Sequence, residues 1–320
     1  MLEYLGYPGK KNNVSAKLAV IDFGTNTARL LIADRCGNGD FRRVFLRREI
    51  VRMGGGFTRT EGLSYAAMQR ALECLDSFAE IIRNHDVSNV LAVATSAVRD
   101  AVNGAEFVDQ ALCKTGIELK VIDGITEGKL TLAGVMAGLD CPCDEALVFD
   151  IGGGSTEYTL AKCGRAEYVN SLPLGVVRLI EGKDSLAAME HEIFTELELL
   201  VEDMRRTGLI PGNDASLIGT SGTSTTLAAI LLNMNGHDHR SVNNMIVSKG
   251  DVKLVFDLLE PMTPEERLGV AGLEKGKEDL IVAGLLIILQ TMDLFKMDKI
   301  QVSDYGLLEG LVVRGAELVH

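Results

Sequence analysis

The sequence has little of what marks secreted, fibrous or disordered proteins. It contains only 6 prolines and 6 cysteines in 320 residues, while 47% of its residues are hydrophobic and 24% are charged. That composition is typical of a globular chain with a large core, and the length suits about two domains. The cysteines show no disulfide framework, so we expect reduced thiols. Cys141-Pro142-Cys143 has no second pair at a matching spacing, so the sequence predicts no metal there.

Long apolar segments and excess positive charge are also missing. The longest apolar run, Leu280–Leu289, has 10 residues, whereas a bilayer-spanning helix needs ~20. We expect it to be a buried helix capped by Asp279. Residues Met1–Ser15 lack the apolar core of a signal peptide and are expected to be a flexible lead-in. The formal net charge of −13 argues against nucleic acid or an anionic membrane as partner, so we expect a cytoplasmic protein.

Short β-rich runs alternate with helical patterns, which predicts an α/β fold. After Ser64, a predicted N-cap, apolar residues recur at steps of three and four, as in a helix packed on one side. Three strands should come before it and two aliphatic strands, covered on both faces, after it. The predicted strands are Lys17–Phe23, Arg29–Asp34, Phe41–Ile50, Asn89–Ala94 and Ile117–Ile122.

One segment of the chain is repeated. The run from Leu18 through Asp22 and Gly24 to Thr27 returns 128 residues later (150 − 22), around Asp150 and Gly152. In each copy a strand ends in Asp, the glycine permits a turn with φ > 0, and a strand returns, Arg29–Asp34 or Tyr158–Lys162. A single copy is most often only a hairpin. Two copies in register favour a cleft with two carboxylates and two rows of loop N–H groups, suited to a phosphate chain and a divalent cation.

A third stretch of small residues, Gly219–Thr226, lies between a predicted strand, Ala215–Ile218, and a predicted helix, Leu227–Leu232. A loop that leads into a helix N-terminus is suited to bind anions. The stretch lacks the Gly-Lys-Ser/Thr ending of a Walker A loop and is not a Rossmann fingerprint. His237 and His239 have no third ligand nearby in the sequence, so we expect a solvated loop rather than a metal site.

Taken in order, these segments resemble the exopolyphosphatase and guanosine pentaphosphate phosphohydrolase family of the actin and sugar-kinase superfamily. The resemblance runs from about Lys17 to Val313. It implies two ribonuclease-H-like domains around a central cleft, residues 16–138 and 139–320, with room for the last helix to pack back on the first domain. The matching segments begin at Asp22, Ala94, Val121, Asp150, Ser171, Gly219 and Val302.

The resemblance also implies roles for individual residues. Glu127 would be the general base and Glu157 the second catalytic carboxylate, while Asp22, Asp150 and Glu157 would hold Mg²⁺ or Mn²⁺. Taken one at a time, a loop glutamate, a strand-end aspartate or a surface base is more often structural. The residues that would bind phosphate are Gly24, Thr25, Asn26, Thr27, Arg29, Arg99, Lys129, Gly152, Gly153, Gly154, Ser155, Gly219, Ser221, Gly222 and Thr223.

Three departures from the family pattern bear on function. Thr126-Glu127-Gly128-Lys129 stands where Glu-Glu-Ala-Arg is usual, Val242-Asn243-Asn244 lacks a usual His-Gly, and Lys277 replaces an arginine. The additional C-terminal helical domain of longer relatives is also expected to be absent. The resemblance implies a homodimeric exopolyphosphatase that acts on inorganic polyphosphate. A guanosine pentaphosphate phosphohydrolase, a sensor that binds without turnover and a kinase of the superfamily remain alternatives.

Overall fold

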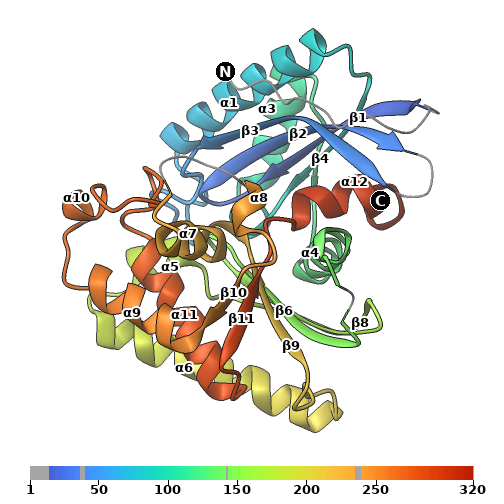
Figure 1. Cartoon of the computed structure of the whole chain (residues 1–320). Coiled ribbons are helices and arrows are strands. Elements are labelled where there is room, and N and C mark those ends of the chain that lie inside the picture. The colour runs from blue at the N-terminus through green and yellow to red at the C-terminus, as the bar shows by residue number, and fades with distance from the viewer. Residues whose placement is uncertain (1–13, 37–39, 142, 235–238, 320) are drawn as a thin grey trace.

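The computed structural model describes residues 14–36, 40–141, 143–234 and 239–319, and two β-sheets form its two halves (Figure 1). The first sheet has the order β3-β2-β1-β4-β5 and the second β10-β11-β9-β6-β7-β8. The predicted α/β class with two sheet-centred halves is therefore confirmed. The strands are β1 (Val14–Phe23), β2 (Thr27–Cys36), β3 (Phe41–Ile50), β4 (Asn89–Ala94), β5 (Leu119–Val121), β6 (Glu145–Ile151), β7 (Thr156–Lys162), β8 (Arg165–Leu172), β9 (Ser216–Thr220), β10 (Ile246–Ser248) and β11 (Lys299–Val302).

Helices cover the two sheets and connect their strands. They are α1 (Tyr65–Asn84), α2 (Ser96–Arg99), α3 (Gly104–Thr115), α4 (Gly124–Gly138), α5 (Val176–Gly182), α6 (Leu186–Thr207), α7 (Ser221–Leu231), α8 (His239–Val242), α9 (Lys249–Leu259), α10 (Pro264–Arg267), α11 (Ile281–Leu294) and α12 (Leu307–Leu318). Within the described ranges, no helix combines the length and the apolar character that a membrane crossing requires. The predictions for residues 1–13, Pro142 and His237 lie outside the described residues.

Most predicted elements are found, with a few corrections. β3 has the predicted bounds, and the Ser64 side chain accepts the Ala67 N–H at the start of α1, as predicted. β5 is shorter than predicted, and β4 is covered on both faces only from Ala92 to Ala94, because its first two residues are exposed. Asp279 does not cap α11 either. The Leu280 and Ile281 N–H groups already bond to the Lys277 carbonyl, and Asp279 pairs with Arg52 at 3.2 Å.

The sequence repeat is a repeat of structure. β1 pairs antiparallel with β2 and parallel with β4, and β6 pairs in the same two ways with β7 and β9. Asp22 lies opposite Arg29 in the first hairpin, and Asp150 lies opposite Glu157 in the second. Each sheet is also followed by a helix, α4 after β5 and α12 after β11.

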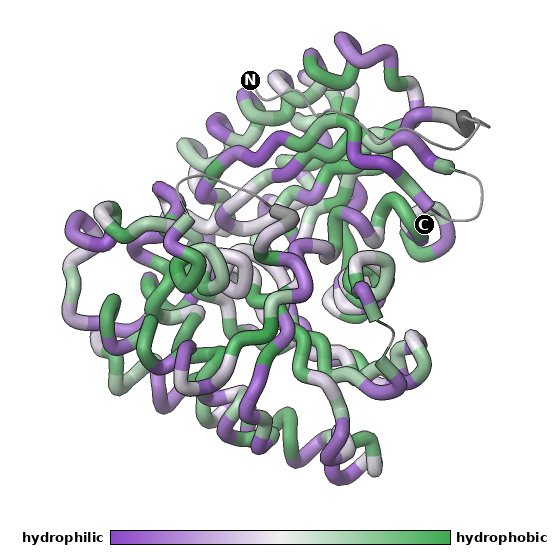
Figure 2. The backbone as a smooth tube through the Cα atoms, in the orientation of Figure 1, coloured by the Kyte–Doolittle hydropathy of each residue, from purple (hydrophilic) through white to green (hydrophobic). Residues whose placement is uncertain are grey.

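In β1 and β6, the first strand of each half, alternate residues face different helices. This is because successive side chains of a strand point to opposite faces of the sheet. In β1, Ala19, Ile21 and Phe23 pack under α1 and α3, whereas Leu18 and Val20 pack under α12. In β6 the residues 128 positions later divide in the same way: one set joins the core with α6 and α11, and the other packs under α4. Figure 2 shows hydrophobic residues along these central strands.

The two helices α4 and α12 are exchanged between the halves. α4 follows a strand of the first sheet, yet Leu132 and Val135 pack on β6, β7 and β9 of the second. α12 follows the second sheet and covers β1 and β2 of the first. Glycines bring the two helices into close contact at the centre of Figure 1: a methyl group added at Gly134 would collide with the Gly306 carbonyl, and one at Gly310 with the Leu130 carbonyl.

Candidate active site

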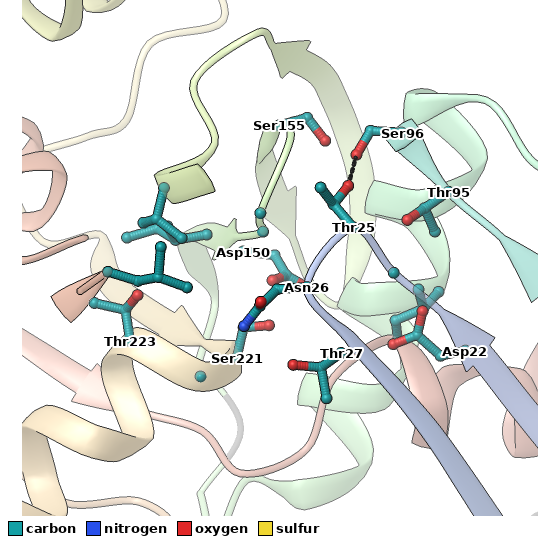
Figure 3. A pocket seen from close by; sticks show the side chains of 18 of the residues that line it. Asp22, Thr25, Asn26, Thr27, Thr95, Ser96, Asp150, Ser155, Ser221 and Thr223 are labelled. Carbon is teal, nitrogen blue, oxygen red and sulfur yellow. Dashed lines mark hydrogen bonds between the residues drawn. The ribbon is translucent and has the colours of Figure 1, made fainter. Parts of the chain in front are cut away.

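A pocket lies where loops of both halves meet (Figure 3). Its walls come from the β1–β2 connection (residues 24–27, the first loop), the β6–β7 connection (residues 152–155, the second loop), the start of α7 and the first turn of α4. Its described lining is Asp22, Gly24, Thr25, Asn26, Thr27, Arg29, Arg48, Thr95, Ser96, Glu127, Asp150, Ile151, Gly152, Gly153, Ser155, Val176, Ser221, Gly222, Thr223, Lys277, Leu280, Ile281 and Leu307.

The first and second loops have the same turn. The Gly24 N–H donates to the Thr27 carbonyl at 3.0 Å, and the Gly152 N–H donates to the Ser155 carbonyl at 2.9 Å. Neither glycine has a positive φ, so the predicted reason for them was wrong. They are needed because a Cβ at either position would lie 3.0 Å from that same carbonyl oxygen.

The first loop lies against both the start of α2 and the second loop. Thr25 Oγ1 lies 2.9 Å from Ser96 Oγ at the start of α2, as the dashed line in Figure 3 marks, and a Cβ at Gly153 of the second loop would lie 2.9 Å from Thr25 Cβ. Gly154 does not line the pocket; a Cβ there would lie 2.6 Å from Ser96 Oγ and 2.9 Å from Thr25 Oγ1. The Asn26 carbonyl accepts the N–H groups of residues 51 and 52, and the Gly153 carbonyl accepts those of residues 177 and 178. These acceptors are therefore used within the protein and do not oppose a bound anion.

The third small-residue stretch is not a loop. Gly219 is part of β9, where a Cβ would lie 2.6 Å from Ile300 Cδ1, and α7 begins at Ser221. The prediction that the helix begins at Leu227 was wrong because burial of Thr223 to Thr226 overrides their weak helix propensity. Ser221, Gly222 and Thr223 line the pocket, so a helix N-terminus does face it. Ser221 has φ 72°, an unfavourable conformation for a residue with a side chain.

Glu127 lies in the first turn of α4, which Asp123 caps by accepting the Thr126 N–H. Its side chain is buried at the pocket wall, and its Oε2 accepts a bond from Arg99 Nη1 at 3.1 Å. Burial, reinforced by the negative charge of Glu157, raises the pKa of Glu127 well above the usual value for a glutamate, although Arg99 opposes the shift. Arg99 itself does not line the pocket and contacts this carboxylate instead.

Glu157 lies behind the pocket wall. Its Oε1 accepts hydrogen bonds from Ser155 Oγ at 2.8 Å and Ser171 Oγ at 2.7 Å, while its buried Oε2 has no hydrogen-bond partner among the described residues. Burial and the neighbouring Asp150 raise the pKa of Glu157 to about 7. Ser155 connects Glu157 to the pocket, because it lines the pocket and donates its hydroxyl proton to Glu157.

The two strand-end aspartates have different surroundings. Asp150 accepts a bond from Thr131 Oγ1 at 3.2 Å and one from Ser221, and burial raises its pKa. Asp22 is paired with Arg29, whose Nε lies 2.9 Å from Asp22 Oδ2. In Figure 3, Asp150 lies beside Ser221 and Asp22 is on the other side of the first loop.

Two cations that we had not assigned as ligands, Arg48 and Lys277, line the pocket. Glu274 binds both, at 3.0 Å from Arg48 Nη1 and 2.5 Å from Lys277 Nζ. Burial lowers the pKa of Lys277 to about 8, and repulsion from Arg48 adds to the effect. Lys129, in contrast, is exposed on α4 and does not line the pocket.

The donor set of the pocket is rich in carboxylates. Three carboxylates line the pocket, and Glu157 adds a buried oxygen without a partner, so a cation would be electrostatically favoured. Among the described residues, no three His, Cys, Asp or Glu side chains are grouped closely enough to enclose a metal. The described carboxylates thus offer a divalent cation one or two direct ligands, and its remaining ligands would come from water or substrate phosphates.

Comparison with known proteins gives one consistent result. A family model, the Ppx/GppA phosphatase family, matches residues 32–318. The chain is 31% identical over 316 residues to exopolyphosphatase 2 of Mycobacterium tuberculosis, covering 93% of this chain and 98% of that protein. A crystal structure of an exopolyphosphatase from Cytophaga hutchinsonii superposes with a TM-score of 0.86 at 29% identity, covering 95% of this chain and 99% of that one.

A further relative is longer. The chain is 31% identical over 312 residues to a bifunctional 3-dehydroquinate synthase/phosphatase of Fusobacterium nucleatum. The match covers 93% of this chain but only 46% of that protein.

Proposed function

The chain belongs to the Ppx/GppA phosphatase family, and from this premise we propose that it hydrolyses the terminal phosphoanhydride of inorganic polyphosphate. Water attacks the terminal phosphorus in line with the bridging oxygen. The new P–O bond forms as the bridging bond breaks, the shortened chain departs with the bridging oxygen, and the attacked group is released as orthophosphate. The observation that carries the proposal is a buried glutamate, Glu127, in the same pocket as two loops and a helix N-terminus suited to bind phosphate.

Glu127 takes the proton of the attacking water. Burial and the charge of Glu157 raise the pKa of Glu127, so its carboxylate is a stronger base than that of an exposed glutamate. Arg99 holds the carboxylate in place through Oε2 and so acts on Glu127 rather than on the phosphate. This assigns Arg99 a different role from the one that the family resemblance implied.

The terminal phosphate would lie between the first and second loops, and the next phosphates would lie toward the start of α7 and Lys277. Residues 25–27, 153, 155 and 221–223 all line this volume. Phosphoryl transfer depends on positioning and on neutralising the charge of the transferred group, which these amides and cations supply.

Asp150 and Glu157 would hold the divalent cation, with Asp22 nearby. The bound ion would neutralise phosphate oxygens and orient the chain end. The protein contributes two features here: Thr131 and Ser221 fix Asp150, and two serine hydroxyls fix one oxygen of Glu157 so that the other is directed away from them.

The lining supports an inorganic substrate over a nucleotide. None of the described pocket-lining residues is aromatic, so the pocket offers no ring on which a guanine or adenine base could stack. The name of the M. tuberculosis relative agrees with this choice. Cytoplasmic location and a homodimer remain predictions, the latter measurable by sedimentation.

Phosphate release from polyphosphate, guanosine pentaphosphate and ATP, each with Mg²⁺, tests the function. We expect turnover of polyphosphate to exceed that of the other two and to fall by ~10²–10⁴ in Glu127→Gln. Faster phosphate release from guanosine pentaphosphate would show that this nucleotide is the preferred substrate instead. Binding of polyphosphate with no release would favour the sensor, and transfer of phosphate from ATP to an acceptor would favour the kinase.

A further inference from the structure

The two halves of the site have matching positions with different residues. Asp22 and Asp150 end equivalent strands, and the residues opposite them in the hairpins are Arg29 and Glu157. The helices after the last parallel strands match as well: Glu127 lies in the first turn of α4 and Glu309 in the first turn of α12. Each half therefore has an aspartate and a helix-start glutamate, but only the first half has an arginine where the second has a glutamate.

Arg29 lies among carboxylates. Its Nε and Nη2 both bond to Asp22 Oδ2, and its charge also interacts with Asp150 and with Glu309. Burial alone lowers the pKa of Arg29, but attraction by Asp22 and Asp150 raises it overall, so the guanidinium stays charged. Asp22, Asp150 and Glu309 are themselves buried, with exposed fractions of 5%, 7% and 3%.

The remaining charges around Arg29 are also paired. Glu309 pairs with Arg43 at 2.9 Å and accepts the Gly306 N–H, while Arg43 also binds Asp304 at 2.8 Å. Without Arg29, Asp22 would lose the cation that binds it and Asp150 would lose a nearby positive charge. Buried carboxylates that lose a cation attract another.

We propose that the Arg29 guanidinium is a built-in cation that does in the first half what an exchangeable divalent cation does in the second, so that the site takes one divalent ion. The inference rests on the proposed function for its chemistry, because two positive centres across a phosphoanhydride neutralise the attacked and departing groups as two metal ions do. Arg29 is thus more than a phosphate contact: it fixes how many metal ions the enzyme needs.

The stoichiometry of metal binding tests this directly. Chelator-treated full-length protein is titrated with Mn²⁺ alone, and free Mn²⁺ is counted by electron paramagnetic resonance. We expect one tight site per chain in the wild type, one in Arg29→Lys, which keeps the charge, and two in Arg29→Gln, which removes it. Arg83→Gln, an exposed arginine on α1, is the charge-matched control and should stay at one.

Kinetics give a second readout. Turnover of polyphosphate by Arg29→Gln should fall at the Mg²⁺ concentration that saturates the wild type and should partly recover at about tenfold more Mg²⁺, whereas Arg29→Lys should need no extra ion. Circular dichroism checks that each variant is folded, and Arg29→Met replaces Arg29→Gln if the latter is not.

The outcomes are distinct. Two tight sites in the wild type, or one in a folded neutral variant, would overturn the proposal. If the numbers of Mn²⁺ sites are as expected but no phosphate is released from polyphosphate, the role of Arg29 is upheld and polyphosphate is rejected as the substrate.

Discussion

Replacing Glu127 by glutamine changes one atom at the position where we place proton transfer. The amide keeps the size of the side chain, and its oxygen can still accept the bond that Arg99 Nη1 donates at 3.1 Å. What it loses is the basic oxygen. General-base loss typically lowers kcat by ~10²–10⁴, which is ~3–5 kcal/mol of activation free energy.

Substrate affinity should behave differently. Glu127 lines a pocket for a polyanion, so neutralising it removes repulsion and KM should stay level or fall. The wild-type kcat should rise with pH through the raised pKa of Glu127, because the base must be ionised, and the variant should lack this step.

The assay is phosphate release from polyphosphate across pH 5–9, with Glu118→Gln as control. Glu118 is exposed just before β5, so its variant should match the wild type in kcat, KM and pH profile. A Glu127→Gln enzyme that retains its kcat, or that loses rate only through a higher KM, would refute the assignment of Glu127 as the base.

Three further predictions concern the cation, the buried charge and the helix contact. EDTA should abolish turnover, and Glu157→Gln should raise the Mg²⁺ needed for half-maximal rate and be partly rescued by excess Mg²⁺; full activity in chelated protein would contradict this. Because burial raises the pKa of Glu157 from 4.5 to about 7, metal-free protein should be most stabilised at low pH. Urea unfolding in EDTA should show that the free energy of unfolding of the wild type falls by up to ~3 kcal/mol relative to that of Glu157→Gln between pH 5 and 8. If the two proteins show the same dependence of unfolding free energy on pH, the pKa of Glu157 is not raised. Gly310→Ala should cost ~1–3 kcal/mol in the same assay because its methyl group meets the Leu130 carbonyl, whereas Gly182→Ala, with open space around it, should not; equal stability of the two would be evidence against tight helix contact.

Local pattern predicted much of this structure, because hydrophobic period and capping are local properties. The bounds of β3 and the cap of α1 follow from residues within a few positions of one another, and each copy of the repeat, around Asp22 or Asp150, is itself a local pattern. The start of α7 could not be predicted from local pattern. Gly, Ser and Thr disfavour a helix, and only burial against the second sheet overrides that preference.

Side-chain direction was harder to predict than backbone. Lys129 is two residues from Glu127, so the helix turns it to the opposite side, into solvent. Arg48 belongs to no motif, and Lys277 was noted only as a departure from the family pattern. Both reach the pocket because β3 and the segment before α11 meet there. The correspondence between Glu127 and Glu309 was hidden because these residues are 182 apart (309 − 127), not 128, owing to the extra elements between β9 and β11.

The exchange of α4 and α12 has a consequence for synthesis on the ribosome. The inner face of the first sheet, which includes Leu18 and Val20, is covered by α12, whose first residue follows Leu18 by 289 positions (307 − 18). At a synthesis rate of ~5–20 residues per second, that face stays uncovered by α12 for ~15–60 s. The sheet is complete by residue 121 but cannot bury both faces until α12 emerges, so the nascent first half is incomplete until the second has been made.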